Sequence, residues 1–160
     1  MLVATHDFET RSAVDLRKTG VYPYAEHPST GVWIMSWCLH EEGTPVRNVQ
    51  RWRPGDPDPV ALLDHVARGG IMKVHNASFE RAIWNRLIRA RICPHWPELR
   101  IEQQDCTMSR CAVLAIPQSL EIAAQVLGAK AKKDMAGNAL MMRMARPRSV
   151  KTIDAQGLLL

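Results

Sequence analysis

The run VWIMSWCLH at residues 32–40 restricts the possible folds most. It is rich in β-branched and aromatic residues and contains no Gly or Pro, so it predicts a long β-strand. A strand is also predicted before it, at residues 2–9, and a third after it, at residues 45–53. The short gap at Glu41-Glu42-Gly43 indicates a hairpin between the second and third strands. The chain therefore begins with antiparallel β-structure.

Helices and strands are predicted to alternate in the rest of the chain. Residues 11–31 contain two Gly and two Pro and favour an ordered surface loop with one helical turn. The remaining predicted elements are a helix at 59–67 ended by Gly69-Gly70, a strand at 71–75, a helix at 77–92, a strand at 99–102, and helices at 106–115 and 117–127. The order β-β-β-α-β-α-β-α indicates an α/β protein with a mixed sheet and helices on its faces.

The bulk composition excludes several classes of protein. The chain has 160 residues, enough for one domain, with 46% hydrophobic and 23% charged residues, so disordered and fibrous classes do not fit. The four cysteines lack zinc-site spacing, and the start shows no signal-peptide pattern, so we expect reduced thiols in a cytoplasmic protein. No apolar run is long enough to span a membrane. The net charge of +5 suits a polyanionic partner.

Asp7-Phe8-Glu9 is the first candidate for chemistry. Side chains at positions i and i+2 of a strand point to the same face, so both carboxylates converge at the end of the first strand. Two neighbouring acids repel each other unless a divalent cation lies between them. The alternative is a pair of solvated acids at a strand end.

The segment HNASFE at residues 75–80 is the second candidate. It follows a short apolar strand and begins a helix. The first and fourth strands would end on the same edge of the sheet, which would bring Glu80 toward Asp7 and Glu9. The alternative is structural: Asn76 or Ser78 caps the helix, and Glu80 suits its dipole. Asp105 is interpreted as the cap of the following helix.

Together these motifs resemble a known superfamily. Asp7-x-Glu9 and Asn76-x-x-Phe79-Glu80 are similar to the first two motifs of the DEDD proofreading exonucleases. The stretches at residues 7–37, 74–87 and 105–148 resemble the exonuclease region of phage DNA polymerases related to bacterial polymerase I. The resemblance implies an exonuclease-like domain at 1–148 followed by a tail at 149–160. It also implies an α/β, ribonuclease-H-like fold: a mixed five-stranded sheet with helices on both faces, lacking the last C-terminal helix.

The resemblance also implies an activity and a set of site residues. The activity is metal-dependent 3′→5′ hydrolysis of DNA 3′ ends, with two Mg²⁺ or Mn²⁺ ions about 3.5–4 Å apart. Asp7 would bridge both ions, Glu9 would hold one, and Glu80 would contribute at the second-motif position. Substrate-binding positions would be Phe8, Thr10, Asn76 and Phe79. The implied setting is the cytoplasm of a phage-infected bacterium.

The sequence departs from the family pattern in two ways. The second motif ends in Glu80 where the family usually has Asp, and a longer side chain still reaches a metal directly or through water. The third motif, a Tyr or His shortly before a last Asp, has no match. The alternative function is therefore a catalytically impaired remnant that binds nucleic acid or protein. With either function, a protein partner would be a separate polymerase subunit, or a second copy of the chain through the C-terminal segment, and another chain could supply the last acid.

Overall fold

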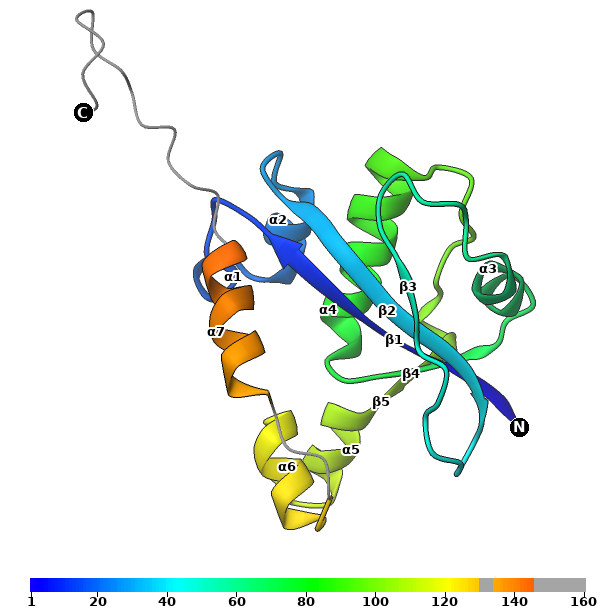
Figure 1. The fold of residues 1–160 in the computed structure, drawn as a ribbon, viewed down its shortest axis with the longest axis vertical. Coiled ribbons are helices and arrows are strands. Elements are labelled where there is room, and N and C mark those ends of the chain that lie inside the picture. The colour runs from blue at the N-terminus through cyan, green and yellow to red at the C-terminus, as the bar shows by residue number, and fades with distance from the viewer. Residues whose placement is uncertain (130–133, 146–160) are drawn as a thin grey trace, which may run out of the picture.

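The computed structural model describes residues 1–129 and 134–145 and contains one sheet of five strands in the order β3-β2-β1-β4-β5. β1 pairs with β2, and β2 with β3, in antiparallel fashion, whereas β1–β4 and β4–β5 are parallel. The predicted mixed sheet is therefore confirmed (Figure 1). The strands are β1 Leu2–Arg11, β2 Gly31–Glu41, β3 Gln50–Trp52, β4 Ile71–Val74 and β5 Gln104–Cys106.

Helices connect the strands and cover the sheet. They are α1 Leu16–Thr19, α2 Val21–Glu26, α3 Val60–Ala67, α4 Ala77–Ala82, the π-helix η1 Ile83–Ile92, the 3₁₀-helix η2 Ile101–Gln103, α5 Thr107–Val113, α6 Leu120–Val126 and α7 Met135–Met144. None of those that the structure describes is long and apolar enough to cross a membrane.

Successive side chains of β1 point alternately to a face buried in the core and to a polar face. His6 and Phe8 are buried on the face that α4 and η1 cover, while Asp7 and Glu9 point to the opposite face. On that opposite face Asp7 pairs with Ser36 of β2. One strand therefore supplies both core side chains and the acidic pair.

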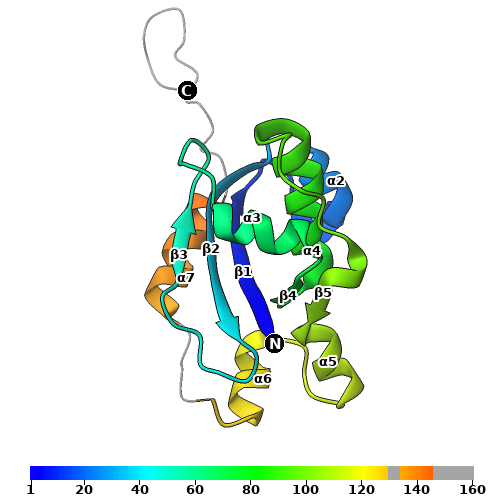
Figure 2. The ribbon, with the colours of Figure 1, turned by 90° about the vertical axis from the view of Figure 1, so that its right-hand side faces the viewer.

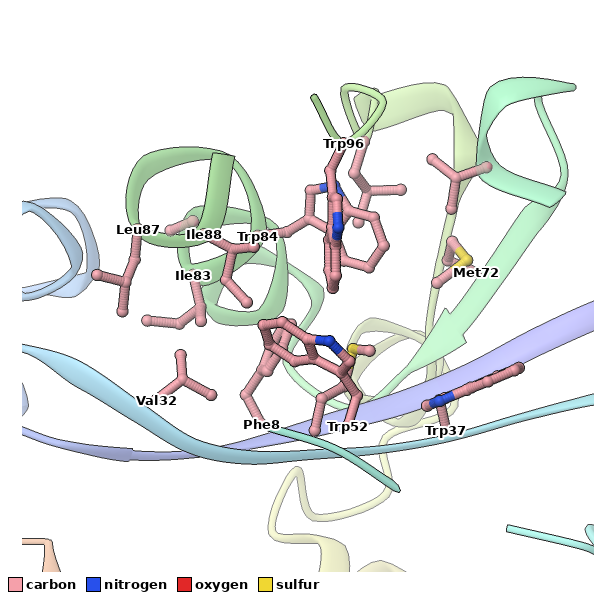
Figure 3. Close-up of a cluster of buried hydrophobic side chains, with 14 of the residues drawn as sticks. Phe8, Val32, Trp37, Trp52, Met72, Ile83, Trp84, Leu87, Ile88 and Trp96 are labelled. Atoms are coloured by element: carbon pink, nitrogen blue, oxygen red, sulfur yellow. The ribbon is translucent and has the colours of Figure 1, made fainter. Parts of the chain in front are cut away.

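Tryptophans dominate the core between the sheet and α4–η1. The rings of Trp84 and Trp52 lie 4.9 and 4.7 Å from that of Trp96, and all three side chains are at most 1% exposed. Figure 3 shows this cluster beside Phe8 and Ile83. Aromatic side chains bury large apolar areas, so this cluster fixes α4 and η1 on the sheet.

The last turn of the described chain covers the other face. Trp33 Nε1 donates a hydrogen bond to the carbonyl oxygen of Met144 (3.2 Å), and the backbone N–H of Ser12 donates to that of Ala145 (2.9 Å). Figure 2 shows α7 and α4 on opposite sides of β1. Helices on both faces were predicted and are confirmed. The proposed tail at 149–160, and the basic residues of the C-terminal region other than Arg143, lie outside the described residues.

Several predicted boundaries were wrong. The strand predicted at 45–53 is limited to β3, and the loop predicted at 11–31 contains two short helices. The strand predicted at 99–102 is not formed: Leu99 is buried in the core, a 3₁₀ turn follows, and β5 begins only at Gln104. No helix was predicted for residues 135–144, where α7 lies. Local sequence does not determine these positions because packing on the core overrides propensity.

β4 is much shorter than β1, and this difference opens the edge of β1. Their pairing covers only Val3 to Thr5 of β1, opposite Ile71 to Lys73. From His6 onward, the side of β1 away from β2 faces the start of α4 instead of another strand. The acidic residues of β1 lie along this open part.

Candidate active site

Asp7 and Glu9 form an acidic pair on one face of β1. Asp7 is exposed and Glu9 is half-buried. Burial raises the pKa of the Glu9 carboxyl, and the negative charge of Asp7 raises it further. Although the Asp7 side chain reaches solvent, surrounding protein atoms remove part of its water, which raises its pKa, and the nearby His75 opposes that shift. A bound cation would reduce the repulsion between the two carboxylates of Asp7 and Glu9.

Glu80 approaches the same strand from the side. It lies in the first turn of α4 and is only 2% exposed. Asn76, with φ of 60°, adopts the left-handed conformation that turns the chain from β4 into this helix. The backbone N–H of Phe8 donates a hydrogen bond to the Glu80 carboxylate. Glu80 therefore lies against the open edge of β1, between Asp7 on one face and His6 on the other.

The electrostatics of Glu80 couple it to both other acids. Burial raises the pKa of Glu80 well above its ordinary value, and the charges of Asp7 and Glu9 add to that rise. The oxygen Oε2 is buried and has no hydrogen-bond partner in the structure. The site therefore concentrates three carboxylates and compensates them poorly with protein donors.

His6 is the nearest group to the buried side of Glu80. Its Nε2 lies 3.6 Å from Glu80 Oε2, too far for a hydrogen bond, and neither ring nitrogen has a partner. The ring packs edge-on against Phe8 and Trp84. Burial lowers the pKa of His6 to about 3, so the imidazole is neutral near neutral pH.

Acid should therefore destabilise the metal-free protein through His6. Its pKa is near 6.5 in an unfolded chain and about 3 in the folded one, so the unfolded chain takes up the proton first as the pH falls. We expect the free energy of unfolding to fall by up to about 1.4 kcal/mol per pH unit across that interval because of this group. Urea titrations of the wild type and of His6→Leu, between pH 6.5 and about pH 3, would measure this fall in the free energy of unfolding. The variant should show a flatter profile, and parallel profiles would contradict the assignment.

His75 is a site residue to which the sequence analysis gave no role. It follows β4 directly, and its charge acts on Asp7. Its Nδ1 lies 2.9 Å from Thr107 Oγ1, and its Nε2 lies 2.9 Å from the carbonyl oxygen of Gln118. The signal was present in the sequence: His75 ends a strand parallel to β1, and the ends of adjacent parallel strands meet at one sheet edge.

The predicted substrate-binding residues divide into two groups. Phe8 is a core side chain, so only its backbone can face a ligand. The Thr10 hydroxyl lies 2.9 Å from the Tyr24 hydroxyl, and the half-buried Phe79 ring packs 6.1 Å from the Tyr24 ring. The Asn76 side chain accepts a hydrogen bond from Ser78 and does not cap the helix. Phe79 packs against the hydrophobic core, whereas Thr10 and Asn76 make polar contacts with Tyr24 and Ser78.

Asp105 is not the helix cap that the sequence predicted. It lies in β5, and Cys106 occupies the cap position of α5. Its carboxylate makes an ion pair with Arg110 at 2.6 Å, and Lys73 Nζ lies 3.5 Å away. Asp105 is thus neutralised by neighbouring cations and stays apart from the acidic site.

The donor chemistry of the acidic site fits Mg²⁺ or Mn²⁺ in kind. Asp7, Glu9 and Glu80 offer only carboxylate oxygens, which these ions prefer. The orphaned Glu80 Oε2 has spare capacity to accept a positive ligand. In the described residues, however, no three His, Cys, Asp or Glu side chains are yet grouped closely enough to hold an ion together.

Comparison with known proteins finds a similarity to a phage DNA polymerase. Over 142 residues the chain is 29% identical to the DNA polymerase of Bacillus phage SP02, an alignment that covers 88% of this chain and 20% of that polymerase. The chain is similar to part of a phage DNA polymerase. It spans about a fifth of the length of that relative. No protein-family model and no solved structure matches the chain. This similarity supports the predicted resemblance to a phage DNA polymerase. It does not test the assignment as an exonuclease.

Proposed function

We propose that this chain is a metal-dependent 3′→5′ exonuclease domain that removes nucleotides from single-stranded DNA 3′ ends. The observation that carries the proposal is the arrangement of Asp7, Glu9 and Glu80 around the open edge of β1, where the charge of Asp7 acts on both other acids. Similarity to a phage DNA polymerase supports DNA as the substrate. A carboxylate cluster that its described neighbours compensate only in part suits a site that takes up divalent metal from solution.

Each residue has a distinct task in this proposal. Asp7 and Glu9 hold the metal, and Glu80 contributes an oxygen from the other side of the strand. When bound, Mg²⁺ or Mn²⁺ would supply an activated water and positive charge beside the leaving 3′ oxygen. Thr10 and Asn76 supply polar contacts to the terminal nucleotide.

His75 would stabilise the ionised form of Asp7, since a positive or polar neighbour favours a carboxylate over a carboxylic acid. Its two hydrogen bonds, to Thr107 and to Gln118, fix the orientation of the ring. This makes it a positioning residue for the acidic pair.

A catalytically impaired remnant is the second candidate. The favouring observation is in α7, the last helix of the described chain, whose sequence MAGNALMMRM has no acid, Tyr or His. A fourth acid and a water-orienting side chain are therefore missing from the position where such a helix could supply them. In this case the domain binds DNA, or the rest of a polymerase, without turnover.

Release of labelled nucleotide separates the two candidates. Single-stranded DNA labelled at its 3′ end is incubated with the chain in Mg²⁺ or Mn²⁺, beside the same strand labelled at its 5′ end. The exonuclease proposal predicts early loss of the 3′ label as mononucleotide, with the 5′ label retained in a ladder of shortening strands. Retention of both labels at high protein concentration would contradict turnover and leave the binding module.

A further inference from the structure

A cavity on the outer side of α4 and η1 includes three arginines among its seven lining residues. Its volume is about 270 Å³, and its lining includes Arg81, Arg86, Arg89, Tyr22 and Glu98. Three guanidinium groups thus face one acidic residue across a small concave surface. Like charges gathered around a cavity favour an anion within it.

The three arginines come from two consecutive helices: Arg81 lies near the end of α4, and Arg86 and Arg89 lie on η1. The hydrogen bonds of η1 run between residues five apart, as from the Cys93 N–H to the Ile88 carbonyl. Arg81 donates to the Tyr22 hydroxyl at 3.1 Å, and Arg86 lies 5.9 Å from the centre of the same ring. Long π-helices are rare, and short π segments often mark functional sites.

Most donors of these arginines have no protein acceptor. Each guanidinium has five N–H donors. Among the described residues, Arg81 donates one bond to Tyr22, Arg89 donates one to the Trp96 carbonyl, and Arg86 makes an exposed ion pair with Glu26 at 3.3 Å. The Arg81 Nε is buried and unpartnered. Phosphate oxygens are the acceptors that guanidinium forks match best.

The cavity is close to the acidic site along the chain. Arg81 directly follows Glu80, and α2 contacts both regions, since Tyr24 bonds to Thr10 while Tyr22 lines the cavity. Figures 1 and 2 show α2 beside α4. Asp7 and Glu9 lie on the other face of β1, so a strand whose 3′ end lies at Asp7 would have to pass the open edge of β1 beside Glu80 to reach Arg81 and Arg86.

We infer that this cavity, named here the arginine cavity after Arg81, Arg86 and Arg89, binds backbone phosphates of a single DNA strand upstream of its 3′ end. The inference rests on the proposed function for the identity of the ligand. The shared chemistry is that of a phosphate oxyanion, which a strand, a released nucleotide or free phosphate would each provide. The multiple guanidinium groups along the helix favour a strand.

Salt dependence of binding tests this inference without any cleavage. A fluorescent oligothymidine of about 16 nucleotides is titrated in EDTA at several salt concentrations. For single strands, each lost phosphate contact reduces the slope of log Kd against log salt by about 0.7. The double variant Arg81→Gln with Arg86→Gln should therefore lose about 1.4 of the slope. A matched double variant, Arg47→Gln with Arg68→Gln, removes the same charge at the far end of the sheet and should retain it.

A second variant keeps the test decisive if the arginine variant unfolds. Glu98 is exposed, so Glu98→Gln should fold normally while removing the acid from the lining. We expect it to tighten strand binding, with Glu121→Gln on α6 as the unchanged control. An unaltered affinity in Glu98→Gln, or equal slopes in the two arginine double variants, would overturn the inference.

Two further arms separate the sources of phosphate and the two proposals. At matched ionic strength, millimolar inorganic phosphate should not displace the oligothymidine. Displacement would show that the cavity binds a small anion and would overturn the assignment of a DNA strand as its ligand. If nucleotide release occurs but the slopes are equal, only the cavity assignment fails. If the slopes differ but no nucleotide is released, the cavity assignment stands and the exonuclease proposal fails.

Discussion

Replacing Asp7 by asparagine should reduce nucleotide release from a DNA 3′ end at least about 100-fold, the loss typical when a group that stabilises developing charge is removed. Asp7 is the acid whose charge acts on both Glu9 and Glu80, so it is central to the cluster. The amide is nearly isosteric, and Asp7 is exposed, so the fold should be unaffected. The measurement is the rate of 3′-label release under single-turnover conditions, with binding of the strand measured in parallel.

Asp105→Asn is the matched control for that variant. It makes the same chemical change in an acid already neutralised by Arg110 and Lys73. Its rate should stay within about twofold of wild type, because ion pairs near the surface contribute only about 1 kcal/mol or less. An Asp7→Asn protein as active as the control would contradict the assigned role of Asp7.

Replacing Trp84 by alanine should cost about 3–5 kcal/mol of unfolding free energy, the range for truncating a buried aromatic residue. Trp84 is fully buried, contacts the Trp96 ring, and donates from Nε1 to the Pro97 carbonyl at 2.9 Å. For a chain of this size the loss corresponds to roughly 6–20 °C in Tm. Urea and thermal unfolding monitored by circular dichroism would measure it.

Trp33→Ala provides the comparison on the opposite face. Trp33 is 38% exposed and loses only its contact with Arg11 and its bond to the Met144 carbonyl. We expect a cost of about 1 kcal/mol. Equal destabilisation by the two variants would contradict the placement of the core between the sheet and α4–η1.

The placement of the acidic pair could be predicted from sequence because it depends on a local rule. Alternation along a strand places Asp7 and Glu9 on one face whatever the rest of the chain does. The parallel pairing of β1 with β4, and hence the approach of Glu80, followed from the order of helices and strands. These two steps were enough to predict that Asp7 and Glu9 share one face of β1 and that Glu80 approaches the same strand.

The burial of Glu80 could not be predicted in the same way. It depends on how far β4 extends beside β1 and on the packing of α4 against His6, neither of which has a local signal. The π-helix was also missed, because the apolar positions Ile83 and Leu87 have ordinary α-helical spacing. The cap predicted at Asp105 was wrong because Asp105 itself lies in β5, and the helix begins one residue later, after Cys106.

Binding of Mn²⁺ shows whether the carboxylates of Asp7, Glu9 and Glu80 together form a metal site. Free Mn²⁺ is followed by electron paramagnetic resonance during titration of the wild-type chain and of the variant Asp7→Asn/Glu9→Gln/Glu80→Gln. We expect saturable uptake by the wild type and none by the variant, with both proteins folded. Equal uptake by the two proteins, or none by either, would contradict a metal site at the edge of β1.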